Sequence, residues 1–137
     1  MKKLLFAFVL LVLLAGCAYN EYEYTVTPIT WQTITAQTAR DMMMELDDFI
    51  LLDVRTLEEF EARRIDGAIL IPHNQILDRA AEELPDKNAV ILVHCRSGQR
   101  SATAAAVLAG LGYLHVYDFG GIINWYQFHS QSWKRIF

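Results

Sequence analysis

Apolar and polar positions follow two different spacings along this chain, and their alternation predicts its secondary structure. From residue 31 onward, short apolar runs typical of strands alternate with stretches that have the spacing of amphipathic helices. Strands are predicted at 31–33, 49–54, 68–71, 89–94 and 116–119, and helices at 36–45 with Thr35 as N-cap, 57–62, 75–83, 100–111 and 122–128. This alternation predicts an α/β fold, a five-stranded parallel sheet with helices on both faces.

The predicted strand at 89–94, AVILVH, places the candidate chemistry. Its residues are apolar on both faces, as a central parallel strand requires when helices cover both sides of the sheet. Cys95 follows it directly and is expected at the carboxyl end of that strand. In open α/β sheets this edge is the usual place for ligand binding.

The first residues have a pattern of their own. Lys2 and Lys3 precede an unbroken apolar run at residues 4–14, which is shorter than the ~20 residues of a membrane-spanning helix and is typical of a signal peptide. The next residues, Leu-Ala-Gly-Cys at 14–17, resemble the bacterial lipobox, in which cleavage occurs before an acylated cysteine. The resemblance implies lipidation of Cys17, and two or three acyl chains suffice for stable membrane anchoring.

These patterns divide the chain into three expected parts: a signal peptide at 1–16, a lipidated N-terminus and tether at 17–30, and a folded domain at 31–137. The tether is polar and tyrosine-rich, and it lacks helical periodicity. The expected location is extracytoplasmic, with the lipid in a bacterial membrane. Ala18 after the lipidated cysteine favours the outer membrane in a Gram-negative bacterium; otherwise the chain stays on the outer face of the plasma membrane.

Composition narrows the range of partners. A chain of 137 residues is long enough for one domain with a hydrophobic core. Without residues 1–16 it has ten basic and sixteen acidic residues, a net charge of −6, which argues against a nucleic-acid partner. The four histidines lack the spacing of metal ligands, and the methionine run at 42–44 is typical of core packing. No metal or other cofactor is expected.

The chain contains two cysteines, and Cys95 has no partner for an internal disulfide once Cys17 is acylated. Positive potential favours the reactive thiolate form, and Arg96 and Arg100 flank the loop after Cys95. The helix predicted from residue 100 points its free N–H groups back toward the thiol, and Gly98 lets the loop curl around one point. These features predict an activated nucleophile; the alternative is a small buried side chain at a strand end.

The length of the loop separates two kinds of chemistry. In cysteine-dependent phosphatases five residues lie between the cysteine and the arginine, and they form a cradle for a phosphoryl group. In HCRSGQRS, residues 94–101, Cys95 and Arg100 are separated by four residues, Arg96, Ser97, Gly98 and Gln99. The shorter loop suits a single sulfur atom on the thiol better than a bound phosphate.

Five segments in order, between about Trp31 and Trp125, resemble the rhodanese family of single-domain sulfurtransferases. CRSGQRS matches the family's C-R-x-G-x-R-S loop, LLDVR matches its D-V-R strand end, and EEF matches the segment that follows. IDGAILIP follows the family's I-P-G-A-x-x-I-P run, and GYLHVYDFGGIINW follows its glycine-pair ending. The resemblance implies a rhodanese-like fold for residues 31–137.

The resemblance also implies a two-step sulfur transfer. Cys95 would take the outer sulfur of a small anionic donor such as thiosulfate, and the resulting persulfide would pass it to a thiol or cyanide acceptor. N–H groups of residues 96–100 would hold the persulfide, while Arg96 and Arg100 attract the donor. No further cysteine is present to act as acceptor, so the acceptor comes from outside the chain and could be a protein.

Asp53 and Arg55 end the strand predicted at 49–54, and two interpretations of them stay open. Arg55 either contributes to the positive field of the site or pairs with Glu58 or Glu59, while Asp53 binds loop amides. The chain departs from the family pattern nearby, where Arg63, Arg64 and Asp66 replace the usual Gly, His and Pro of G-H-I-P-G-A. This departure changes the local loop and the surface that a partner would meet.

Two further functions compete with sulfur transfer to small acceptors. One is a carrier or binding module in which Cys95 accepts sulfur and delivers it to a partner protein with little free turnover. The other is phosphatase or arsenate-reductase chemistry, which the four-residue loop disfavours.

Overall fold

The computed structural model describes residues 31–126. The predicted signal peptide, Cys17 and the tether up to residue 30 lie outside these residues, as do the last two positions of the helix predicted at 122–128. The elements are β1 (Gln32–Thr33), α2 (Ala36–Glu45), β2 (Ile50–Asp53), α3 (Leu57–Ala62), β3 (Ile69–Leu70), η1 (His73–Gln75), α4 (Ile76–Glu83), β4 (Val90–Cys95), α5 (Gln99–Gly110) and β5 (His115–Gly121). A helical turn follows at residues 122–126.

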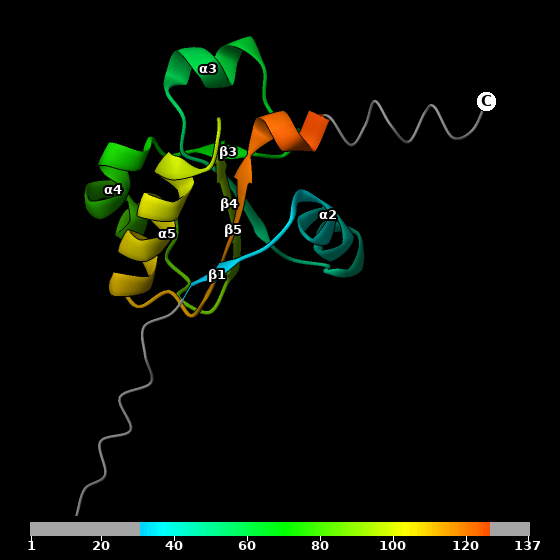
Figure 1. Ribbon diagram of the computed structural model, residues 1–137. Helices are drawn as coiled ribbons and strands as arrows, with labels where there is room; N and C mark the ends of the chain where they lie inside the picture. The colour runs from blue at the N-terminus through cyan, green and yellow to red at the C-terminus, as the bar shows by residue number, and fades with distance from the viewer. Residues whose placement is uncertain (1–30, 127–137) are drawn as a thin grey trace, which may run out of the picture.

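The strands form one five-stranded sheet in the order β1-β5-β4-β2-β3, and every pairing is parallel. This confirms the predicted fold class. Strand β4 lies at the centre between β5 and β2, as its apolar sequence predicts. The carboxyl ends of all strands therefore meet at one edge, which α3 caps from above in Figure 1.

Helices cover both faces of the sheet (Figure 1). Helices α4 and α5 pack on one face in a cluster that includes Ile91, Val93 and Cys95 of β4. Helix α2 and the turn at 122–126 pack on the other face, with Leu92 of the same strand. Side chains along a strand alternate between the two faces of the sheet. Cys95 therefore points to the same face as Ile91 and Val93, the face that α5 covers.

Side-chain caps fix where the helices on the sheet begin. The predicted N-cap Thr35 accepts a hydrogen bond from the N–H of Thr38, which confirms that start of α2. Thr56 caps α3 in a reciprocal box: its Oγ1 accepts from the N–H of Glu59, and a Glu59 carboxylate oxygen accepts from the N–H of Thr56. The box places Glu59 on the side of α3 that faces the loop after β4.

Candidate active site

The loop after β4 wraps around the sulfur of Cys95. Gly98 has a φ of 109° and serves as the N-cap of α5, which begins at Gln99, one residue before its predicted start. This left-handed conformation is available to glycine at little cost, and it turns the N–H of Gly98 toward the thiol. The Gly98 nitrogen lies 3.1 Å from Cys95 Sγ and donates to it. The loop is therefore folded around the sulfur atom.

This environment lowers the pKa of the Cys95 thiol below its ordinary value. Burial opposes this shift because it raises the pKa, and Cys95 is 0% exposed. Hydrogen bonds from the Ser101 side chain and from the N–H groups of Ser101, Gly98 and Ser97 stabilise the thiolate and outweigh burial. The Ser101 hydroxyl also lies 3.0 Å from the Gly98 carbonyl oxygen, so its proton can go to that carbonyl or to the thiolate.

Two glycines of β5 support the loop from the side. A Cβ atom on Gly121 would lie 2.6 Å from the Arg96 carbonyl oxygen and 2.8 Å from the Ser97 Cα, so the loop backbone occupies the space of a side chain. Gly120 has a φ of 81°, and the β4–β5 register shifts between Val93 and Cys95. The strand is irregular at the point where the loop rests on it, which is why this pair of positions carries glycine.

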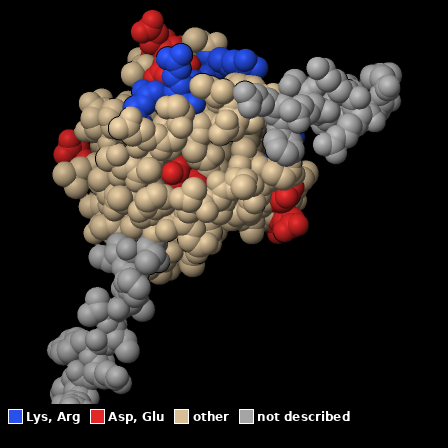
Figure 2. Space-filling model, in the orientation of Figure 1, with Lys and Arg blue, Asp and Glu red and all other residues tan. Residues whose placement is uncertain are grey.

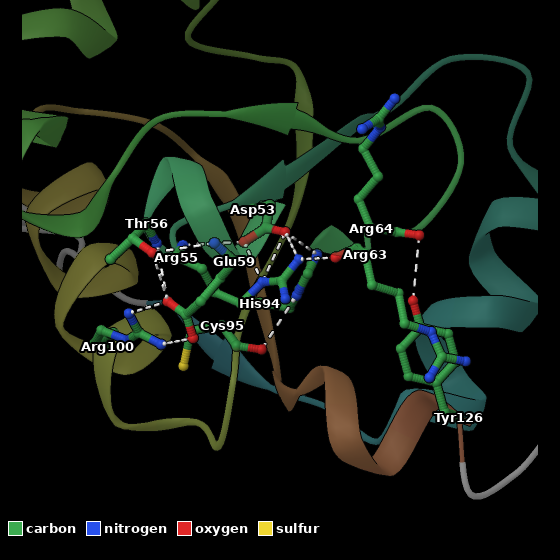
Figure 3. A network of polar contacts seen from close by, with 10 residues as sticks. All are labelled: Asp53, Arg55, Thr56, Glu59, Arg63, Arg64, His94, Cys95, Arg100 and Tyr126. Atoms are coloured by element: carbon green, nitrogen blue, oxygen red, sulfur yellow. Dashed lines mark hydrogen bonds and ion pairs between the residues drawn. The ribbon is translucent and has the colours of Figure 1, made fainter. Parts of the chain in front are cut away.

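Arg100 lies within an ion pair that connects α5 to α3. Its two terminal nitrogens donate to the two oxygens of Glu59 at 2.7 and 2.9 Å (Figure 3). This fork lowers the pKa of Glu59 to about 2 and raises that of Arg100, to which the Cys95 thiolate also contributes. Much of the Arg100 charge is thus balanced by Glu59.

Arg55 also has a carboxylate partner, but not the predicted one. The expected pairing with Glu58 or Glu59 is wrong: Arg55 Nη2 lies 2.6 Å from Asp53 Oδ2, within a fork in which Nε also donates. Both side chains are buried, and a buried charge needs an opposite charge beside it to offset its loss of water. Asp53 is buried next to Arg55, whereas Glu58 is exposed and Glu59 is only partly buried. Asp53 accepts the N–H of Arg55 at 3.0 Å, as predicted for a loop amide.

His94 is buried on the opposite face of β4 from Cys95. Its ring lies 5.1 Å from that of Phe119, and Nε2 is 3.7 Å from Asp53 Oδ2 without forming a hydrogen bond. Burial lowers the pKa of His94 despite the nearby Asp53 carboxylate. The imidazole is neutral near pH 7 and packs behind the loop.

A hollow of about 430 Å³ opens over this edge of the sheet. We call it the site hollow; it is lined by Arg55, Glu59, Ala62, Arg63, Arg96, Ile122, Ile123 and Tyr126. Of the predicted binding residues, Arg96, Ser97 and Gln99 have exposed side chains. Figure 2 shows Lys and Arg side chains gathered at this end of the molecule, beside acidic side chains.

Three residues of the site escaped the sequence-based prediction. Ser101 stabilises the thiolate, Glu59 holds Arg100, and Gly121 makes room for the loop. Ser101 closes the CRSGQRS motif, and Thr56 with Glu59 has the spacing of a capping box, so the sequence held a signal for both. The close approach at Gly121 left no signal beyond the glycine pair itself.

No group of three or more His, Cys, Asp or Glu residues in the described part of the chain could hold a metal ion. No helix within residues 31–126 is both long and apolar enough to cross a membrane. The arrangement can supply a nucleophile: it has a thiol with a lowered pKa at the end of the central strand, N–H donors around the sulfur, and arginines that line a hollow at the same edge.

Comparisons with known proteins agree with this geometry. The model of the family described as "Rhodanese-like domain" matches residues 35–128, and the model of the prokaryotic membrane lipoprotein lipid attachment site matches residues 1–18. The thiosulfate sulfurtransferase PspE of Escherichia coli is 38% identical over 71 residues, which cover 52% of this chain and 68% of PspE.

Two further similarities cover more of the relatives' length. A sulfurtransferase of Allochromatium vinosum is 36% identical over 93 residues, which cover 67% of this chain and 85% of that protein. The solved structure of a rhodanese with anions from E. coli is 36% identical, with a TM-score of 0.53, and covers 55% of this chain and 88% of that one. On the family match, the shared sheet and these relatives, the chain belongs to the rhodanese-like domain family.

Proposed function

We propose that this protein is a sulfurtransferase that carries a sulfane sulfur as a persulfide on Cys95. The observation that carries the proposal is the enclosure of Cys95 Sγ by the N–H donors of a four-residue loop, at the end of the central strand. Such donors favour negative charge on the sulfur, both in the thiolate and in the terminal sulfur of a persulfide. The sulfurtransferases among its relatives support the same activity.

Transfer proceeds in two displacements. The Cys95 thiolate attacks the outer sulfur of thiosulfate, a new S–S bond forms, and the S–S bond of the donor breaks with its electron pair leaving on sulfite. The persulfide anion on Cys95 then meets an acceptor nucleophile, such as a thiolate or cyanide. The acceptor attacks the outer sulfur, and the electron pair of the breaking bond returns to Cys95.

The residues around the thiol divide this work. The backbone of residues 96–100 with Ser101 holds the developing charge, and Arg96 attracts the anionic donor. Arg100 is fixed by Glu59 and contributes a positive charge near the sulfur without moving. Asp53 and Arg55 neutralise each other and hold the strand end behind the loop, which is a supporting role.

For the whole protein we propose an extracytoplasmic location with the lipid attached to Cys17. The match of residues 1–18 to the lipid attachment site supports this. Metabolic labelling with a tagged fatty acid tests it: the wild-type chain is expected to take up label and to partition with membranes, whereas Cys17→Ala takes up none.

The test of the activity is the intact mass of the reduced full-length chain in detergent, before and after thiosulfate. A gain of one sulfur atom, reversed by cyanide with release of thiocyanate and missing in Cys95→Ser, is the expected result. No gain in the wild-type chain would overturn the proposal. Hydrolysis of an aryl phosphate by the same preparation would instead favour phosphatase chemistry.

A second candidate is a sulfur carrier that serves one partner protein. The complete burial of Cys95 favours it, since a sulfur at the bottom of the loop is shielded from acceptors in bulk solution. A persulfide that forms with thiosulfate but is discharged slowly by both cyanide and small thiols would support the carrier.

A further inference from the structure

The four arginines around the site differ in whether a carboxylate neutralises them. Arg55 is paired with Asp53, and Arg100 is paired with Glu59. Within residues 31–126, neither Arg63 nor Arg96 forms an ion pair or a side-chain hydrogen bond with a carboxylate, although acidic residues are more numerous than basic ones there. Both arginines line the site hollow, which therefore presents two guanidinium groups that no carboxylate of residues 31–126 neutralises by an ion pair.

Arg63 is held in place from two sides. Its carbonyl oxygen accepts a hydrogen bond from Arg55 Nη2 at 2.6 Å, which fixes the backbone. Its guanidinium carbon lies 3.4 Å from the centre of the Tyr126 ring, and the Tyr126 hydroxyl donates to the Arg64 carbonyl at 3.2 Å (Figure 3). A guanidinium stacked on a ring keeps its N–H groups in the plane of the group, at its edge. That edge matches the two oxygens of a planar carboxylate.

The site hollow has an apolar side as well as a charged one. Ala62, Ile122 and Ile123 contribute to its lining, and Ile123 is 46% exposed. Its volume of about 430 Å³ lies within the range of pockets that take organic molecules, ~300–1,000 Å³. In Figure 3 the Cys95 sulfur and the Arg63–Tyr126 stack lie on opposite sides of the Asp53–Arg55 pair. A molecule that reaches both is elongated.

We propose that the site hollow selects an organic acceptor thiol that carries a carboxylate several bonds from its sulfur, and that Arg63 is the residue that determines this specificity. The inference rests on the sulfur transfer proposed above. The acceptor places its carboxylate against the edge of Arg63, its hydrocarbon part along the two isoleucines, and its thiolate at the loop. Arg96 lines the same hollow and lowers the repulsion between the acceptor and the persulfide anion.

The discharge step balances without a further reagent. The acceptor thiolate, R–S⁻, attacks the outer sulfur of the Cys95 persulfide and forms an S–S bond. The bond between the two sulfurs on Cys95 breaks, its electron pair stays as the Cys95 thiolate, and the product leaves as R–S–S⁻. Each side of the equation carries two negative charges.

The test compares two acceptors that differ only at the far end. The full-length chain in detergent is loaded with thiosulfate, freed of excess donor, and discharged with 6-mercaptohexanoate or with 6-mercaptohexanamide. Five methylene groups separate the thiol from the carboxylate, so the two thiols ionise alike. Loss of the extra sulfur from Cys95 is followed by intact mass in the wild-type chain, in Arg63→Gln, and in Arg79→Gln, whose arginine pairs with Glu83 on α4.

In the wild-type chain and in Arg79→Gln we expect the carboxylate thiol to discharge the persulfide about fivefold faster than the amide, the ratio that one partly exposed ion pair supplies. In Arg63→Gln the ratio of the two discharge rates falls to about one. Discharge by the amide thiol, which needs no arginine partner, shows that this variant still folds and carries the extra sulfur. Equal rates in the wild-type chain, or a preference that survives in Arg63→Gln, would overturn the inference.

A second measurement separates this inference from the sulfurtransferase proposal. The arginine Nε–H signals of the nitrogen-15-labelled chain are recorded while hexanoate or hexanamide, which have no thiol, is added. We expect the Arg63 signal, assigned from its absence in Arg63→Gln, to shift with hexanoate and stay in place with hexanamide. A chain that forms no persulfide but shows this shift would lose the transfer proposal and keep the carboxylate site. Absence of the shift would overturn the carboxylate site whatever the chemistry.

Discussion

The two ends of the parallel sheet each carry a hollow of similar size, yet their linings have little in common. The site hollow at the carboxyl ends measures about 430 Å³ and is lined by three arginines, Glu59 and apolar side chains. The hollow at the amino ends measures about 370 Å³ and is lined by Asp48, Phe49, Ile50, Asp86, Asn88, Ala89 and Val90, with no basic residue. Volume alone therefore does not distinguish a candidate active site in this fold.

The two ends of the sheet also differ in how many backbone N–H groups are free to bind a ligand. At the amino end β4 and β5 pair in regular register from Val90 onward, so the peptide groups there are used by the sheet. At the carboxyl end the register shifts after Val93, and Gly98 turns an N–H group toward the sulfur. The carboxyl end thus has N–H donors available for a ligand. At the amino end fewer N–H groups are available, because the regular strand pairing uses them.

Among the substitutions considered, Gly121→Ala should disturb the loop at the carboxyl end of the sheet most strongly. The added methyl group would meet the Arg96 carbonyl and the Ser97 Cα, neither of which can move without displacing the loop. We expect a loss of about 3 kcal/mol in the free energy of unfolding and a more than tenfold fall in persulfide formation. Urea unfolding and the mass assay measure the two effects.

Gly110→Ala is the matched control for that change. Gly110 is the last residue of α5, and a Cβ there meets nothing within 4 Å. The control is expected to be as stable as the wild-type chain or more so, by up to about 1 kcal/mol. Full persulfide formation by Gly121→Ala would show that the loop does not depend on its contact with β5.

A smaller effect is expected for Glu59→Gln, which removes the charge that holds Arg100. An amide can accept from only one of the two Arg100 nitrogens, so we expect a loss of about 2 kcal/mol at pH 7, read from the urea midpoint. The pKa of Glu59 is lowered to about 2 in the folded chain, from a usual value of 4.5. Its contribution is therefore complete above pH 4.5 and lost as the pH falls toward 2.

The stability difference between wild type and Glu59→Gln should accordingly shrink over that acidic range. Glu61→Gln, on the same helix without a hydrogen bond to Arg100, is the control and should match the wild type throughout. A difference that stayed constant from pH 7 down to pH 2 would contradict the role of the ion pair.

Ser101→Ala is expected to change the pH dependence of the reaction more than its maximum rate. The lost hydroxyl no longer stabilises the thiolate, so the pKa of Cys95 rises and the inflection of persulfide formation moves to higher pH. Initial rates with thiosulfate across a pH series measure it. Thr103→Ala, which removes a hydroxyl that donates to the Gln99 carbonyl, should leave the inflection unchanged. The same shift in both variants would assign the effect to the helix start as a whole.

The smallest effect belongs to the amino end of the sheet. Asp48→Asn removes a carboxylate from the hollow there, and we expect persulfide formation and discharge to stay within about a factor of two, as for a surface change without structural contacts. The mass assay with thiosulfate and cyanide is the measurement. A larger change would mean that the two ends of the sheet are energetically coupled.

The sheet and its helices could be predicted from the sequence because their signals are local. The apolar run at 89–94 and the polar segments around it fixed the central strand to within one residue of β4. The edge strands β1 and β3 are each shorter than predicted, since pairing on one side only supports fewer residues. The 3₁₀ turn η1, before α4, was not anticipated.

The contacts of the arginines could not be predicted in the same way. Glu59 and Arg100 are 41 residues apart, and the pattern of the chain does not say that α3 stands over the start of α5. Three carboxylates, those of Asp53, Glu58 and Glu59, lie close to Arg55 in the sequence. Arg55 pairs with Asp53 because both side chains are buried at the end of the strand. Ion-pair choices depend on burial and on the final packing, which appear only in the folded chain.

The basic residues are distributed unevenly over the described part of the molecule. Five of the eight Lys and Arg residues between 31 and 126 stand around the carboxyl edge: Arg55, Arg63, Arg64, Arg96 and Arg100. Arg55 and Arg100 are neutralised by Asp53 and Glu59, so the positive field at this edge comes from Arg63, Arg64 and Arg96, with acidic side chains beside them (Figure 2). These three arginines should speed the capture of a small anion, and the rate of capture should fall as added salt screens their charges.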